Sequence, residues 1–126
     1  MKMKKAILFI LMSLVFASCV NEKKRHLERL NELIGTNFDY QDERITMNQE
    51  QDFSSLVTEI SIPLTPIEKQ QILSNNKHFF RYYETKVDSF VFKGFSYQFE
   101  NERIRESINI EKDSMSLNYS IQEGGL

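Results

Sequence analysis

The chain has 126 residues, 40% of them hydrophobic, and its 16 Lys and Arg against 18 Asp and Glu give a formal net charge of −2. This balance argues against nucleic-acid binding, which needs a basic patch to neutralise phosphates. The length leaves room for one small domain but not for two. Because Gly and Pro are scarce and no low-complexity run is visible, the composition favours a folded chain over a disordered one.

The first 19 residues carry the most informative local pattern. Lysines at positions 2, 4 and 5 precede an uncharged, mostly apolar run over residues 6–16, and the small residues Ala17 and Ser18 then lead to Cys19. A charged start, an apolar middle and small residues before a cleavage site form a secretory signal peptide. The apolar run is too short to cross a bilayer, which needs about 20 residues. We therefore predict that residues 1–18 are removed on export.

Because Cys19 directly follows the small residues, this leader resembles the signal peptide of bacterial lipoproteins, whose cleavage motif is here Phe16-Ala17-Ser18-Cys19. The family usually has leucine where this chain has Phe16, which is also a large apolar residue. The resemblance covers residues 1–19 and implies that Cys19 is lipidated on its thiol, becomes the new N-terminus and is acylated on its amine. The alternative is a plain secretory signal with an incidental cysteine.

An anchor at Cys19 would use the only cysteine, leaving none for disulfides, metal thiolates or nucleophilic catalysis. Two or three acyl chains would hold the protein on the membrane permanently. Asp directly after the anchor signals inner-membrane retention in enteric-type systems, and this chain has Val20 there. The prediction is therefore a lipid-anchored protein of the bacterial cell envelope, on the outer membrane.

The mature chain from Cys19 onward is more acidic than the whole, because residues 1–18 contain three lysines and no acidic residue, which leaves 13 Lys and Arg against 18 Asp and Glu. We expect residues 19–25 to form a short polar tether and residues 26–126 to form a single domain. Within that domain, the 3–4 spacing of Leu27, Leu30, Leu33 and Ile34 predicts an amphipathic helix, with Gly35 as its end.

The middle of the chain is predicted to alternate between loop, strand and helix. Residues 37–52 are polar and weakly periodic, which indicates a loop with a short strand or turn near residues 44–47. Alternating side chains over residues 56–62 predict a strand. Thr65, Pro66 and Glu68 have the spacing of a helix N-cap, a first-turn proline and a capping box, and they predict a helix from Pro66 to about Asn75.

From His78 onward the period becomes two, which predicts strands over residues 78–84, 89–100, 104–111 and 115–122. The parity of the aromatic residues changes at Lys93-Gly94, where we expect a bulge or a tight bend. The short connections favour antiparallel neighbours. The predicted fold is therefore α+β, an antiparallel sheet of four to five strands with two helices packed on one face.

Nine aromatic residues lie within the 21 residues from Phe79 to Phe99. Most are expected in the core, but adjacent pairs such as Tyr82-Tyr83 point to opposite faces of a strand, so one member of each pair faces away from the helices. An exposed aromatic strip can bind a protein or a glycan by apolar stacking. If the strip binds, the candidate contacts are Tyr82, Tyr83 and Tyr97, whose hydroxyls tolerate water.

No pattern in the sequence points to catalysis, a cofactor or a metal. His26 and His78 belong to no spaced ligand set, and the acidic residues Asp39, Asp42 and Glu43 lack the spacing of a calcium loop. No nucleophile elbow or glycine-rich phosphate loop is present. We therefore predict a non-enzyme that acts as a small envelope interaction module. The alternatives are an immunity or inhibitor lipoprotein that neutralises a periplasmic toxin or hydrolase and, third, a small hydrolase.

Overall fold

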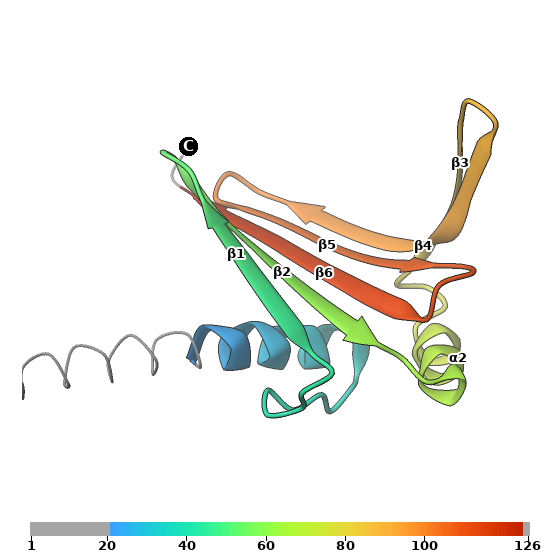
Figure 1. Ribbon diagram of the computed structural model, residues 1–126, viewed down its shortest axis with the longest axis horizontal. Helices are drawn as coiled ribbons and strands as arrows, with labels where there is room; N and C mark the ends of the chain where they lie inside the picture. The colour runs from blue at the N-terminus through green and yellow to red at the C-terminus, as the bar shows by residue number, and fades with distance from the viewer. Residues whose placement is uncertain (1–20, 125–126) are drawn as a thin grey trace, which may run out of the picture. The chain divides into compact units, whose positions relative to one another are not determined.

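The computed structural model describes residues 21–124 (Figure 1). The predicted signal peptide and Cys19 lie outside the described residues. The chain divides into two compact units, residues 1–42 and 43–126. This boundary falls inside the single domain that the sequence predicts over residues 26–126.

In the first unit, residues 21–34 are helical. Leu27, Leu30 and Ile34 are buried and Leu33 is half-buried, which confirms the predicted amphipathic pattern. The helix also includes residues 21–25, so the polar segment that we expected to be a tether is helical from residue 21 onward.

Gly35 ends this helix, as predicted. Its φ of +70° lies in the left-handed region that glycine adopts without steric cost, and its N–H donates to the carbonyl of Asn31 at 2.8 Å. The Asn31 side chain then fixes the loop that follows. Its Oδ1 accepts from the N–H of Phe38 and its Nδ2 donates to the carbonyl of Phe38, both at 2.9 Å.

The second unit is built on one antiparallel sheet, which confirms the α+β class. The prediction of four to five strands was wrong, because the sheet has six. The polar segment after Arg44 pairs fully with its neighbour through backbone hydrogen bonds, although it has no apolar alternation. The strands are β1 (Thr46–Gln51), β2 (Ser55–Pro63), β3 (Arg81–Val87), β4 (Phe90–Glu100), β5 (Ile104–Glu111) and β6 (Ser116–Gly124).

The strand order is β1-β2-β6-β5-β4-β3, so the C-terminal strand lies between β2 and β5 (Figure 1). Side chains of these central strands meet in rows on one face. Ile60 and Ile108 both lie opposite Tyr119, and Ile62 and Ile110 both lie opposite Leu117. All of these side chains are buried. The other face carries small polar residues, among them Ser61, Ser96, Ser107, Asn109, Asn118 and Ser120.

Helix α2 (Pro66–Asn75) matches its predicted bounds, and its capping box is confirmed. The Thr65 hydroxyl accepts from the N–H of Glu68 at 3.2 Å, and the Glu68 carboxylate accepts from the N–H of Thr65 at 2.9 Å. The helix buries Ile72.

The strand predicted from His78 begins later, at Arg81. The N–H groups of Phe79 and Phe80 both donate to the carbonyl of Asn76, at 3.1 and 3.2 Å. These residues therefore belong to the turn that closes α2, and their backbone donors are not available to a strand partner.

Of the two features expected at Gly94, the bulge is absent. The pairs Tyr83–Gly94 and Glu84–Lys93 follow each other with no inserted residue. A Cβ atom at Gly94 would lie 2.6 Å from the carbonyl oxygen of Ile110, so only glycine allows β5 to approach this closely. The β3–β4 hairpin turns away from the rest of the sheet (Figure 1).

Candidate interaction site

The outer hairpin, defined here as residues 84–93, extends beyond the end of β5. β5 pairs with β4 only from Gly94, whereas β3 pairs with β4 as far as Val87 and Phe90. Just after β5, the N–H of Lys112 donates to the carbonyl of Lys93 at 2.8 Å. This hydrogen bond continues the pairing of β4 with β5 by one residue. In the part of the chain that the structure describes, the two strands of the outer hairpin pair otherwise only with each other.

Asp88 and Ser89 form the two-residue turn at the end of the outer hairpin. Asp88 has a φ of 54°, in the left-handed region that Asp and Asn tolerate better than other residues with a Cβ atom. Two-residue turns with positive φ match the twist of the flanking strands. The sequence therefore specifies a tight hairpin here, and the side chains next to the turn are held in a fixed register.

Three apolar side chains next to this turn form the tip patch, defined as Val87, Phe90 and Phe92. Val87 and Phe90 are cross-strand partners, and Phe92 lies two residues further along β4, so all three share one face. Their exposed fractions are 52%, 67% and 45%. The tip patch is therefore an apolar surface in contact with water.

The opposite face of the outer hairpin is charged. Glu84 and Lys93 form an exposed ion pair at 3.7 Å, and Lys86 and the 47%-exposed Val91 follow on the same face. A ribbon of two strands is at best marginally stable alone in water. The exposed apolar residues thus add little to the core, and exposed apolar surface of this kind often marks an interaction site.

The three predicted contact tyrosines have different environments. Tyr82 is 52% exposed and packs edge-to-face on Phe95 with the ring centroids 5.6 Å apart. The Tyr83 hydroxyl donates to Oδ1 of Asn109 at 2.9 Å, on the opposite face of the strand. Tyr97 is half-buried and stacks on Phe79 at 4.2 Å. The structure therefore does not bring the three tyrosines together, and only Tyr82 is largely exposed.

Sequence reasoning missed the tip patch, because it favoured tyrosines over phenylalanines as exposed residues. Two signals in the sequence were available. Glu84, Lys86 and Lys93 place charges on both strands of the hairpin, which is unusual for strands that are buried on both faces. The parity change at Gly94 also marked the point where the apolar face stops facing the core.

Other exposed apolar side chains lie away from the tip patch. Phe53 is fully exposed in the β1–β2 turn, Ile67 is 68% exposed on α2, and Phe99 and Met115 are exposed at other strand ends. These positions do not form a row on one hairpin face, as the tip patch does.

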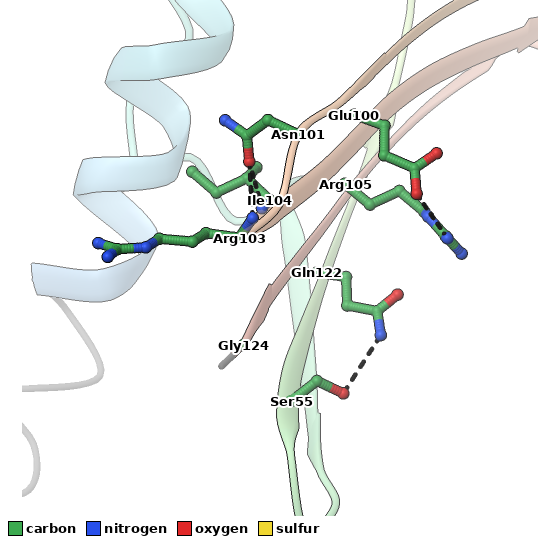
Figure 2. Close-up of a pocket in the computed structure, with 8 residues that line it drawn as sticks. All are labelled: Ser55, Glu100, Asn101, Arg103, Ile104, Arg105, Gln122 and Gly124. Carbon is green, nitrogen blue, oxygen red and sulfur yellow. Dashed lines mark hydrogen bonds and ion pairs between the residues drawn. The ribbon is translucent and has the colours of Figure 1, made fainter. Parts of the chain in front are cut away.

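A small pocket lies where β2, β5 and β6 meet the β4–β5 turn (Figure 2). Its cavity of about 50 Å³ has room for one or two water molecules and is well below the size of ordinary ligand sites. Its polar groups hold the strands together. Oδ1 of Asn101 accepts from the N–H groups of Arg103 and Ile104, and Gln122 donates to the Ser55 hydroxyl at 3.2 Å. The pocket is therefore best explained as packing at one end of the central strands.

One titratable pair lies in the buried face of the sheet. The Tyr119 hydroxyl donates to Oε2 of Glu106 at 2.5 Å, and both side chains are almost fully buried. Glu106 interrupts the apolar face of β5, as the sequence pattern indicated. The hydrogen bond satisfies the Tyr119 hydroxyl inside the core, which is a structural role.

Among residues 21–124, no group of three or more His, Cys, Asp or Glu side chains is placed to bind a metal ion. Within the same residues, no helix is both long enough and apolar enough to cross a membrane. Comparison with known proteins adds no assignment, since no family model, curated protein or solved structure matches this chain.

Proposed function

We propose that this protein is a lipid-anchored, non-catalytic module of the cell envelope that binds a protein or glycan partner through the outer hairpin. The observation that carries the proposal is the tip patch, three apolar side chains held in one row on a hairpin that extends into water. Covering these side chains would remove apolar surface from water, which is the main driving force of most protein association.

The anchor in this proposal is Cys19, which would attach the protein to the outer membrane. It is supported by the lipoprotein-like leader over residues 1–19. We expect the protein to incorporate radiolabelled palmitate in cells, and we expect the Cys19→Ala variant to lose the label and leave the membrane fraction. A Cys19→Ala variant that keeps both the label and its membrane association would contradict the anchor.

The binding surface is tested by substituting Phe90 and Phe92 together with threonine, which removes the aromatic surface and keeps a residue that favours strands. We expect partner recovery from envelope extracts to fall at least about tenfold, as for the loss of two central apolar contacts. The matched control is Ile67→Thr, which removes an equally exposed apolar side chain from α2. Recovery that is equal in the two variants would refute the tip patch as the binding surface.

An inhibitor or immunity lipoprotein is the second candidate, favoured by the acidic charge of the mature chain. An acidic surface accelerates association with a basic cleft, and this steering weakens as salt rises. The inhibitor function predicts one stoichiometric partner whose association rate falls steeply between low and physiological salt. The interaction module that we propose first predicts partners from a larger envelope assembly and a weak salt dependence of the association rate.

A further inference from the structure

The outer edge of β3 is a second surface that could bind a partner, through backbone groups that pair with no strand of the sheet. β3 is the last strand in the sheet order, and in the described residues its only strand partner is β4. An edge strand presents a row of backbone N–H and C=O groups that can pair with another strand. β3 is seven residues long and has no proline, so nothing in its backbone prevents such pairing.

The register of β3 shows which backbone groups point outward. The Lys93 carbonyl accepts from Lys112 on the β5 side, so it is directed away from β3. Glu84 is the cross-strand partner of Lys93 and therefore forms a non-hydrogen-bonded pair with it. The N–H and C=O groups of Tyr82, Glu84 and Lys86 must then point to the free edge, since hydrogen-bonded and non-hydrogen-bonded pairs alternate along antiparallel strands.

These outward groups allow β3 to pair with an antiparallel copy of itself in only a few registers. Centring the pair on Glu84 places two glutamates opposite each other, and centring it on Lys86 does the same for two lysines. Like charges directly opposite are destabilising. Centring the pair on Thr85 places Glu84 of each copy opposite Lys86 of the other, which gives two ion pairs. This register also uses the outward N–H and C=O groups of Glu84 and Lys86.

We propose that the partner of the β3 edge is a second copy of this chain, paired antiparallel about Thr85 to give one continuous twelve-stranded sheet. A two-fold axis would pass between the two Thr85 residues, as expected for a closed homodimer. The same register places Val87 opposite Tyr83 of the second copy, on the face that carries the tip patch. The two tip patches then lie on one shared surface. The inference does not depend on the anchor or on another partner.

A cysteine at the two-fold axis tests this register directly. The two Thr85 Cα atoms would form a non-hydrogen-bonded pair about 4.5 Å apart, within the range for a disulfide. The full chain carrying Thr85→Cys is oxidised in intact cells, and the parent chain reports the background from Cys19. We expect at least about tenfold more disulfide-linked dimer from Thr85→Cys than from the parent chain. A yield equal to the parent's would overturn the proposal.

Glu84→Cys is the matched control, because it moves the cysteine by one residue on the same exposed strand. In the proposed register the two Cα atoms at position 84 are offset by two residues and lie beyond about 7 Å, too far for a disulfide. We therefore expect background dimer from this variant. Efficient linkage through position 84, or equal linkage through both positions, would overturn the register.

The charge pattern gives an independent test. Adding Glu84→Lys to the Thr85→Cys chain places lysine opposite Lys86 of the second copy, and we expect cross-linking to fall at least about fivefold. Adding Lys86→Glu as well exchanges the two charges and should restore cross-linking to within about twofold. Lys93→Glu is the control, because it removes the ion pair within the hairpin between Lys93 and Glu84 but leaves the side chains of β3 unchanged. It should leave the yield of cross-linked dimer unchanged. Failure of the exchange to restore cross-linking would contradict the proposed ion pairs.

Discussion

At the scale of single residues, Gly94 marks the point on β4 where the outer hairpin begins. It lies where the pairing of β4 with β5 stops, and it allows the backbones of β4 and β5 to approach closely. The sequence predicted a special feature here from the parity change of the aromatic residues. It could not distinguish a bulge from a bend, because that depends on the register of β4 against β3 and β5.

We predict that Gly94→Ala destabilises the protein by about 1–3 kcal/mol, the usual cost of forcing extra atoms into a packed site. The added Cβ would lie 2.6 Å from a backbone carbonyl oxygen, and backbone cannot move away as easily as a flexible side chain. Urea unfolding of the two chains measures the difference. Ser96→Ala, two residues further along the same strand, is the control and should change stability by less than about 0.5 kcal/mol.

The predicted contact residues show how far residue chemistry can be read from sequence. Strand alternation placed Tyr82 and Tyr83 on opposite faces, and this is confirmed. It could not show that Asn109, 26 positions away, would bind the Tyr83 hydroxyl, nor that Phe79 would stack on Tyr97. Both contacts depend on which strands are neighbours, which no local pattern in the sequence specifies.

At the scale of elements, the capping box of α2 was fully predictable, because its residues are close in sequence and each satisfies a backbone donor of the other. β1 was the opposite case. Its sequence over Thr46–Gln51 is polar and has little alternation, and it forms a strand because β2 offers backbone partners along its whole length. A strand of this kind is determined by its neighbour more than by its own side chains.

The capping box also gives a pH prediction. The hydrogen bond from the Thr65 N–H lowers the pKa of Glu68 below its ordinary value of 4.5, and Arg44 adds to this effect. A carboxylate whose folded pKa is lowered stabilises the fold above its unfolded pKa, and that stability is lost as pH falls through the folded pKa. Glu68→Gln should therefore be less stable than the parent at pH 7, and the difference should shrink below pH 4.5.

The size of this effect should be about 0.3–1 kcal/mol at pH 7, as for an exposed charge at a helix N-terminus. Urea unfolding at a series of pH values measures it. Thr65→Ser keeps the capping hydroxyl and should preserve the pH dependence of the parent. A constant difference between the Glu68→Gln variant and the parent at all pH values would show that the carboxylate charge has no role.

At the scale of the whole molecule, the fold separates two kinds of apolar surface. One face of the sheet is buried through the central strands, whereas the tip patch on the outer hairpin faces water. The sequence shows that residues 79–99 are rich in aromatic side chains, but it does not show which of them face the core and which face water. That division begins at Gly94, where the pairing of β4 with β5 stops. The function that we propose rests on this exposed surface being held near a membrane.

Photo-cross-linking in intact cells, with a photoreactive phenylalanine analogue placed at position 90, tests whether the outer hairpin contacts a partner. The control carries the same analogue at position 67, which is equally exposed on α2. We predict a discrete cross-linked species from position 90 that is absent from position 67. The same products from both positions, or none from position 90, would contradict the central claim that the outer hairpin is the binding surface.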